Sequence, residues 1–292
     1  MRFCATVLIL FVALLTVESQ TKRALLVGIG EYPSETGWSA IHGDNDVPLI
    51  SDVLIKRGFA PENIDKLTNN QATKKKIMES LKKLKTRANP NDIIYIHFST
   101  HGQQVTDIDG DEEDGFDEAI IPFDASKAFN KGSYEGENHL VDDELNSVLS
   151  EIRAKIGKSG TLLVVVDACH SGDSTRGETD VNDSIVIRGT NEVFNIGAKR
   201  DFKVKSVVKK IDWVEISATQ SYQNNYEFKI NGMYYGSLSY AIKLTLPELT
   251  YGSDFTTLFK LIQQKREEMN VSRYPQRPMM LGNSFYLNQK VF

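Results

Sequence analysis

The chain has 292 residues, of which 40% are hydrophobic and 25% charged, so its composition is that of an ordinary globular protein with one large or two small domains. It carries 34 Lys and Arg against 39 Asp and Glu, a formal net charge of −5, and no basic stretch is dense enough to follow a nucleic-acid backbone. Its two cysteines, Cys4 and Cys169, exclude a disulfide scaffold and any cysteine-rich metal site.

Residues 1–19 have the pattern of a secretory signal. Arg2 precedes an unbroken apolar run from Val7 to Leu15, and modest side chains at 17–19 favour cleavage near Ser19. We therefore expect a secreted or periplasmic protein that keeps no membrane segment. A retained N-terminal anchor is the alternative, although the run is shorter than the roughly 20 apolar residues of a membrane helix. The mature chain keeps one cysteine, Cys169, which is either a buried small hydrophobe or a reactive thiol.

The following part of the chain alternates apolar strands with amphipathic helices. Continuous apolar runs, typical of strands buried on both faces of a parallel sheet, are expected at 23–29, 92–98 and 161–166. Helices with one apolar face are expected after Asp46, after Thr73, and from Asp142 or Asp143. This order predicts a layered α/β sheet whose active site lies at the carboxyl ends of the strands.

The pattern lapses after Cys169. Residues 172–210 contain only a short apolar group at 185–187, and a loop of this length in a compact domain is usually functional or flexible. Regular structure resumes at 213–217, followed by expected helices at 237–244 and 254–269.

Polar residues follow two of the expected strands. The second strand runs into Ser99-Thr100-His101-Gly102, and the third into Asp167-Ala168-Cys169-His170-Ser171-Gly172. In neighbouring parallel strands these ends meet, so that His101 could draw the Cys169 thiol toward thiolate and return the proton to a leaving amine. The N–H groups of Gly102 and Cys169 are candidates for an oxyanion hole. Taken singly, a buried cysteine and a histidine at a strand end are also consistent with packing.

These two segments resemble the paired catalytic motifs of the metacaspases and their bacterial relatives, in the caspase-like clan of cysteine peptidases. The resemblance covers roughly Lys22 to Pro278 and includes similar segments at 45–46, 109–118, 140–145 and 216–220. The Gln-Ala-Cys-x-Gly signature of animal caspases is absent. The resemblance implies a three-layer caspase-like α/β fold over residues 20–292, a central and mostly parallel sheet, a Cys169 nucleophile and a His101 proton carrier.

The resemblance also implies a pocket for a basic side chain. Asp46 and Asp167 match the family's acidic pocket residues, with Ser99 on the wall, which implies peptide or protein substrates cleaved after Arg or Lys. Asp46 could instead be a helix N-cap, and a preference for Asn or Asp is a rival specificity. The division implied is a larger part at 20–172, a smaller part at 211–292, and a basic loop at 173–210 that could be cut by the chain itself. A monomer is implied as well.

The acidic segment 107–118 points to a cation. It holds eight acidic side chains, a density that repels itself unless it is solvated or bridged. An EF-hand is rejected because Glu112 stands where the sharp turn needs glycine. The resemblance implies instead a Ca²⁺ site formed by carboxylates matching Asp117, Asp142 and Asp143, with a solvated acidic turn as the alternative.

Other classes of site fit less well. His97 and His101 share a strand face but have no further Cys or His nearby to complete a zinc site, and Gly28-Ile-Gly30 lacks the third glycine of a dinucleotide loop. No Gly-x-Ser-x-Gly motif is present. The rival from another class is a non-catalytic caspase-like module that binds peptides or calcium.

Overall fold

The computed structural model describes residues 20–107, 115–169, 186–195, 211–220, 223–269 and 276–292. The expected signal at 1–19 lies outside the described residues, and so do parts of the acidic segment and of the loop at 173–210. Among the described residues, no helix combines the length and the apolar character needed to cross a membrane.

A sheet of six strands forms the centre of the molecule, with the strand order β11-β8-β7-β3-β1-β2. Five strands are parallel: β1 (Lys22–Gly28), β2 (Ile64–Thr68), β3 (Ile93–Ser99), β7 (Thr161–Asp167) and β8 (Val214–Ser217). The sixth, β11 (Met279–Leu281), is an antiparallel edge strand. Every residue of β3 and β7 is buried, as expected for continuous apolar strands covered on both faces.

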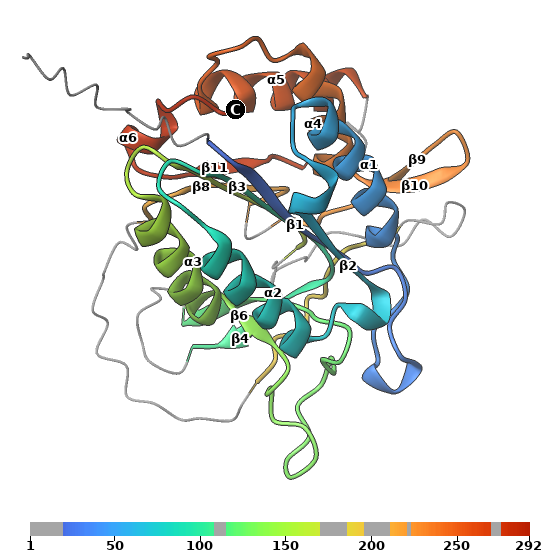
Figure 1. The fold of residues 1–292 in the computed structure, drawn as a ribbon. Coiled ribbons are helices and arrows are strands. Elements are labelled where there is room, and N and C mark those ends of the chain that lie inside the picture. The colour runs from blue at the N-terminus through green and yellow to red at the C-terminus, as the bar shows by residue number, and fades with distance from the viewer. Residues whose placement is uncertain (1–19, 108–114, 170–185, 196–210, 221–222, 270–275) are drawn as a thin grey trace, which may run out of the picture.

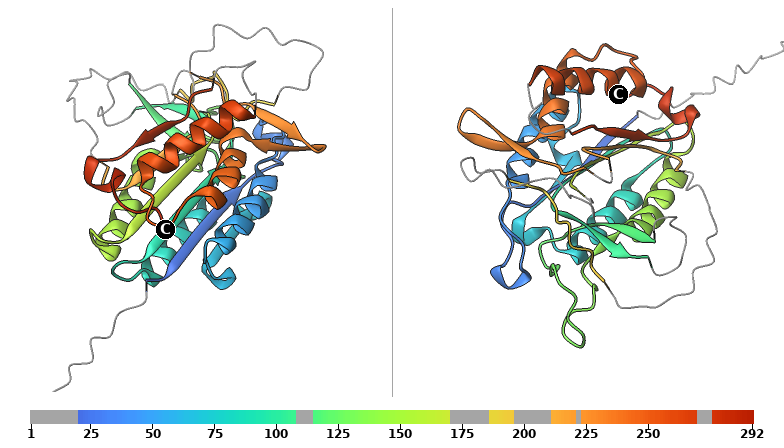
Figure 2. Two further views of the ribbon diagram at one scale, coloured as in Figure 1. Left: turned by 90° about the horizontal axis from the view of Figure 1, so that it is seen from above. Right: turned by 180° about the vertical axis from the view of Figure 1, so that it is seen from behind.

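Helices cover both faces of this sheet, which confirms the predicted layered α/β arrangement (Figures 1 and 2). One core joins the sheet to α1 (Gly43–Lys56), α4 (Ser237–Glu248) and α5 (Phe255–Glu268), and the other joins it to α2 (Lys74–Arg87) and α3 (Asp142–Ile156). Thr73 caps α2 by accepting a hydrogen bond from the Lys76 amide, as predicted. Short helical turns complete the fold at Ser34–Thr36, Pro61–Asn63, Asn69–Gln71 and α6 (Ser284–Leu287).

The expected capping role of Asp46 is wrong. Helix α1 begins at Gly43, before Asp46, and its N-cap residue His42 makes no side-chain capping bond. The Asp46 carboxylate is fully buried and accepts hydrogen bonds from the Ser99 hydroxyl, at 2.5 Å, and from the Gly236 amide, at 3.2 Å. Its partners therefore come from distant parts of the chain, which spacing along a helix does not reveal.

Two small antiparallel sheets stand beside the central one. Strands β4 (Gly102–Thr106), β5 (Phe116–Ile120) and β6 (Leu140–Val141) form the first, in that order, so that β4 is an edge strand. Strands β9 (Glu227–Ile230) and β10 (Met233–Gly236) form a hairpin that projects from the body of the molecule (Figures 1 and 2). Asn231 and Gly232 both have positive φ at its turn, as the tight turn between twisted strands requires.

Candidate active site

The two motif-bearing strands are neighbours. Strand β3 pairs with β7 in a register that places Ser99 opposite Asp167 at the carboxyl edge of the sheet. His101 and Cys169 each follow two residues beyond this pair. The expectation that the two motifs meet at one edge is therefore confirmed.

His101 is held by its ring and its backbone. The imidazole stacks on Trp38, with ring centroids 4.7 Å apart, and the Tyr32 ring lies tilted against it at 5.2 Å. Its Nε2–H donates to the Ser39 carbonyl at 2.9 Å, which leaves Nδ1 as the proton acceptor. Burial lowers the pKa of His101 to about 4 against the opposing effect of the Ser39 hydrogen bond, so the ring is neutral at neutral pH.

Cys169 lies at the same edge, fully buried and not in a disulfide. Its thiol donates to the Gln223 carbonyl at 3.1 Å. Its amide donates at 2.8 Å to the carbonyl oxygen of Arg188, and the Gly102 amide donates to the same oxygen at 3.3 Å. The two amides expected to form an oxyanion hole thus converge on one peptide carbonyl.

That carbonyl belongs to segment 186–195, which crosses the site in an extended conformation. Before Arg188 the segment pairs with the start of β9, because the Arg188 amide donates to the Asn225 carbonyl and the Glu227 amide to the Val186 carbonyl, both at 2.9 Å. After Arg188, Gly189 packs on the cysteine so closely that a Cβ there would lie 2.5 Å from the Cys169 carbonyl oxygen. The segment lies as a peptide substrate would, with the Arg188–Gly189 bond at Cys169.

The Arg188 side chain enters a pocket of carboxylates. Its guanidinium pairs with Asp46 at 2.8 Å and with Asp167 at 3.7 Å, and it also donates to the Ser99 hydroxyl. These are the three residues expected to form the substrate pocket. Arg188, Asp46 and Asp167 have no exposed side-chain surface, so their charges interact without screening by water.

A third carboxylate, Glu227, completes the pocket. It accepts from the Nε of Arg188 and pairs with a terminal nitrogen of the same guanidinium, both at 2.9 Å. The backbone amide and ring of His42 hold Glu227 in turn, at 2.7 and 2.5 Å. Three buried carboxylates therefore surround one guanidinium: Asp167 contacts Nη1, Asp46 contacts Nη2, and Glu227 contacts both Nη2 and Nε.

The charges of Asp46 and Asp167 are tuned in opposite directions. Burial raises the pKa of Asp46 to about 6, although Arg188 opposes the shift. Burial acts on Asp167 too, but Arg188 together with hydrogen bonds from Ser239 and Asn225 outweighs it and lowers its pKa. Of the two carboxylates, Asp167 is thus the one that favours its ionised form, whereas Asp46 is the one that protonates more readily.

Sequence analysis did not identify four residues of this site: Arg188, Asn225, Glu227 and Ser239. Arg188 was one of eight basic residues in the loop 173–210, and nothing in its local pattern set it apart. The other three follow that loop in the sequence, and the β9–β10 hairpin and the start of α4 bring them back to the pocket. The Asn231-Gly232 pair between two short runs that contain aromatic residues is the one sequence pattern that indicates the hairpin.

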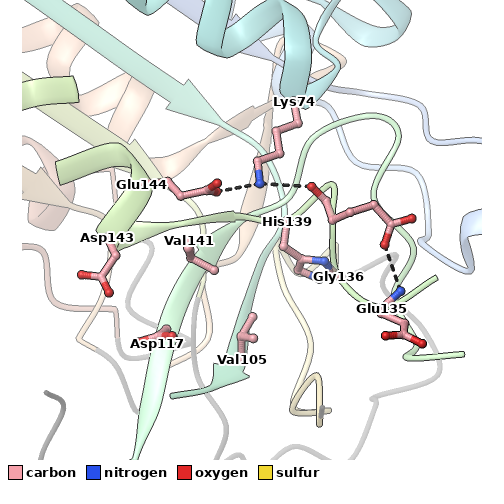
Figure 3. A pocket seen from close by; sticks show the side chains of 10 residues that line it. Lys74, Val105, Asp117, Glu135, Gly136, His139, Val141, Asp143 and Glu144 are labelled. Carbon is pink, nitrogen blue, oxygen red and sulfur yellow. Dashed lines mark hydrogen bonds and ion pairs between the residues drawn. The ribbon is translucent and has the colours of Figure 1, made fainter. Parts of the chain in front are cut away.

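The carboxylates expected to hold Ca²⁺ come from two elements of the chain. Asp117 is on β5, and Asp142 and Asp143 are the first residues of α3. Asp117 and Asp143 line one open pocket of about 440 Å³, shown in Figure 3, where Glu144, next to Asp143, pairs with Lys74 at 2.6 Å. Within the described ranges, no three His, Cys, Asp or Glu side chains converge as a metal cluster, and residues 108–114 lie outside those ranges. Hard oxygen donors on one wall nevertheless fit the ligands that Ca²⁺ prefers.

Comparison with known proteins gives one family. Residues 22–176 match the family model of the metacaspase, peptidase C14 domain. Metacaspase-1 of Eremothecium gossypii is 35% identical over 161 residues, which are 52% of this chain and 32% of that protein. Metacaspase-1A of Aspergillus oryzae is 35% identical over 162 residues, or 53% of this chain and 35% of that protein. The matched part thus spans about a third of the length of each relative.

The fold is shared more widely than the sequence. The crystal structure of protein GSU0716 from Geobacter sulfurreducens superimposes with a TM-score of 0.60 at 21% identity, covering 92% of this chain and 97% of that one. The similarity therefore extends well beyond residue 176, into the part of the chain that contributes Glu227.

Proposed function

The chain belongs to the metacaspase family of C14 cysteine peptidases, and from this premise we propose that it is a secreted endopeptidase that cleaves peptide bonds after Arg or Lys. One observation carries the specificity: an arginine side chain fills the acidic pocket while its own carbonyl accepts hydrogen bonds from Gly102 and Cys169. A basic side chain in the pocket and a scissile carbonyl at the cysteine are the two requirements of such an enzyme.

In the proposed mechanism, His101 and Cys169 share the chemistry. Neutral His101 takes the thiol proton on Nδ1, and the Cys169 sulfur attacks the carbonyl carbon that follows the basic side chain. The oxygen becomes an oxyanion that the Gly102 and Cys169 amides stabilise. When the carbon–nitrogen bond breaks, His101 returns the proton to the leaving amine. Water then attacks the thioester, releasing the new carboxylate and restoring the thiol.

The pocket favours arginine over lysine. Asp46 and Asp167 can hold the end of either side chain, but Glu227 accepts from Nε, which lysine lacks. A lysine ammonium that reaches Asp46 would not replace the Nε donor at Glu227, so His42 would be the remaining partner of that carboxylate within the described residues. Arginine is therefore the better substrate, with lysine accepted at lower efficiency.

The same geometry supports self-processing at one bond, Arg188–Gly189. In the uncut chain this segment occupies both the pocket and the oxyanion site, so it excludes other substrates until it is cut or displaced. Cleavage there would separate a larger N-terminal part from a smaller C-terminal part, as expected for the loop 173–210. The position after Arg188 must be glycine because the Cys169 backbone leaves no room for a Cβ.

Calcium is proposed as a stimulator. Asp117, Asp142 and Asp143 would hold it, and bound Ca²⁺ would supply positive charge that offsets the repulsion among these carboxylates. Asp117 is on β5, which pairs with β4, and β4 begins at the oxyanion residue Gly102. This connection is the physical route by which an ordered acidic face could steady the catalytic loops.

The test is hydrolysis of matched fluorogenic peptides ending in Arg, Lys, Asp or Asn by wild type and by Cys169→Ala. We expect turnover of Arg and then Lys peptides, absent from Cys169→Ala and reduced in excess chelator. Turnover of Asp or Asn peptides alone would refute the specificity. Folded, reduced protein that turns over none of them would favour the non-catalytic binding module instead.

A further inference from the structure

Segment 186–195 is anchored at a second place, beyond the bond at Cys169. Gly189 is paired in parallel with Gly102, and Phe194 with Val105, along the edge of β4 that faces away from β5. The Phe194 amide donates to the Gln104 carbonyl at 2.8 Å, and the Thr106 amide donates to the Phe194 carbonyl at 3.1 Å. The segment therefore adds a short strand to an edge that would otherwise be unpaired, as peptide ligands of sheet proteins do.

The Phe194 ring occupies an aromatic cage. It is 1% exposed, and the rings of Phe129, Tyr134 and His139 surround it with centroids 5.9, 5.8 and 4.3 Å away. Gly136 has a φ of +103°, and a Cβ there would lie 2.9 Å from the Phe194 ring, so the backbone itself forms one wall. Gly136 and His139 also line the pocket of about 440 Å³ that Figure 3 shows.

Between the two anchors, β4 and Lys127 contact Glu192. The two pairs are separated by fewer residues on β4, from Gly102 to Val105, than on the segment, from Gly189 to Phe194. Residues 190–193 of the segment therefore bow away from the edge of β4. Gln103 donates to the Glu192 carbonyl at 2.9 Å, and Lys127 pairs with the Glu192 side chain at 2.9 Å. That ion pair is at the surface and contributes little, so the buried ring is the main source of affinity on this side.

The spacing of the anchors distinguishes Arg188 from the other basic residues of the loop. If Gly189 is counted as the first residue after the Arg188–Gly189 bond, Phe194 is the sixth. None of the other seven basic residues of the loop has an aromatic residue at the sixth position after it. These basic residues are Arg176, Lys199, Arg200, Lys203, Lys205, Lys209 and Lys210. The residues at the sixth position are, in the same order, Asn182, Lys205, Ser206, Lys209, Ile211, Glu215 and Ile216. A pocket for the basic side chain cannot by itself choose among eight candidates, whereas two anchors at fixed spacing can.

We propose that the edge of β4 and the cage around Phe194 form a subsite for an aromatic residue at the sixth position after the cleaved bond, and that Phe194 thereby selects Arg188–Gly189 for self-cleavage. This inference rests on the proposed self-processing. Phe194 is a positioning residue, since it sets the register of the segment without touching the reacting atoms.

The first test follows the fragments of the purified chain over time by mass spectrometry. Phe194→Ala should slow cleavage after Arg188 by at least about tenfold, in line with the loss of a buried aromatic anchor, and should allow cuts after other basic residues of the loop. Phe194→Leu, which keeps most of the apolar burial, should show a smaller loss of the same kind. Val193→Ala, next to the anchor and half-buried, is the matched control and should behave as wild type.

The second test does not depend on the chain's own catalysis. In a Cys169→Ala background the segment stays uncut, and its docking should protect Arg188 from added trypsin. Adding Phe194→Ala should raise the rate of trypsin cleavage at Arg188 by about tenfold or more relative to adding Val193→Ala. Cleavage after Lys158, which is exposed in the turn between α3 and β7 and is followed by Ser159, serves as the internal reference and should not change.

The outcomes separate the two ideas. If wild type never cuts itself although trypsin distinguishes the two variants, self-processing is wrong and with it the selecting role of Phe194. If wild type cuts after Arg188 and Phe194→Ala does so at the same rate and place, the aromatic subsite is wrong while self-processing stands. Equal trypsin rates for the two double variants would likewise overturn the subsite.

Discussion

Replacing Glu227 by glutamine tests the arrangement of the pocket most directly. The carboxylate accepts from Arg188 Nε at 2.9 Å and pairs with a terminal guanidinium nitrogen at the same distance, with no exposed surface. Glutamine keeps the shape and one oxygen acceptor but removes the charge. For substrates that end in arginine, this hydrogen bond should lose the contribution of the negative charge, whereas lysine has no Nε donor to make it.

The size of the effect follows from the kind of bond. Hydrogen bonds to charged groups contribute about 1.5–3 kcal/mol and ordinary ones about 0.5–1.5 kcal/mol, so loss of the charge at Glu227 should lower kcat/KM for Arg peptides by about fivefold to tenfold. The kcat/KM for Lys peptides should change much less. The ratio of kcat/KM for Arg peptides to kcat/KM for Lys peptides should therefore fall by nearly the same factor as the value for Arg peptides. The assay is initial-rate hydrolysis of a matched Arg and Lys peptide pair by the self-processed enzyme.

Glu151→Gln provides the matched control, because it makes the same chemical change on the exposed surface of α3, where Glu151 pairs only with Lys85 in the part of the chain described. It should leave both rates and their ratio unchanged. If Glu227→Gln reduces both peptides equally, Glu227 has a general structural role. An unchanged ratio in a folded variant would refute the assignment of Glu227 to arginine recognition.

Three further outcomes are expected. Gly189→Ala should block self-cleavage and leave a full-length band on a denaturing gel, because the added Cβ would lie 2.5 Å from the Cys169 carbonyl oxygen; a normal rate of cutting would contradict that packing. With arginine in the pocket, burial raises the pKa of Asp46 to about 6 while the guanidinium favours the ionised carboxylate. The kcat for Arg peptides, which reports groups of the enzyme–substrate complex, should therefore decline as pH falls toward and below about 6. Asp46→Asn should abolish that acid limb in its residual activity. For calcium, Asp143→Asn should raise the concentration that gives half-maximal activity, measured by titration against a buffered chelator; an unchanged midpoint would remove Asp143 from the site.

The catalytic edge could be predicted from sequence because its causes are local. Two continuous apolar runs specify buried parallel strands, and parallel neighbours bring their carboxyl ends together, so that His101 and Cys169 follow the paired residues Ser99 and Asp167. That these two strands are neighbours is a property of the whole sheet, and the observed strand order shows it.

The acidic pocket depends on long-range contacts and was only partly predictable. Glu227 reaches Arg188 from a hairpin beyond the loop, and Asp46 satisfies its oxygens with Ser99 and Gly236 instead of the helix end. A helix cap and a pocket carboxylate have the same local sequence pattern, so only the tertiary partners separate them. The selection of Arg188 among eight basic residues depends on the same kind of partner.

The order of the strands has a further consequence for the fate of a cut chain. Strand β8 comes after Arg188 in the sequence, yet it lies between β11 and β7, and α4 packs against α1 from the other side of the cut. The two fragments would therefore share one sheet and one apolar core, and neither could leave without exposing that core to water. Nicking would thus be invisible to gel filtration and visible only after denaturation. A processed protein would be a single particle made of two chains, and its pocket would exist only while both are present.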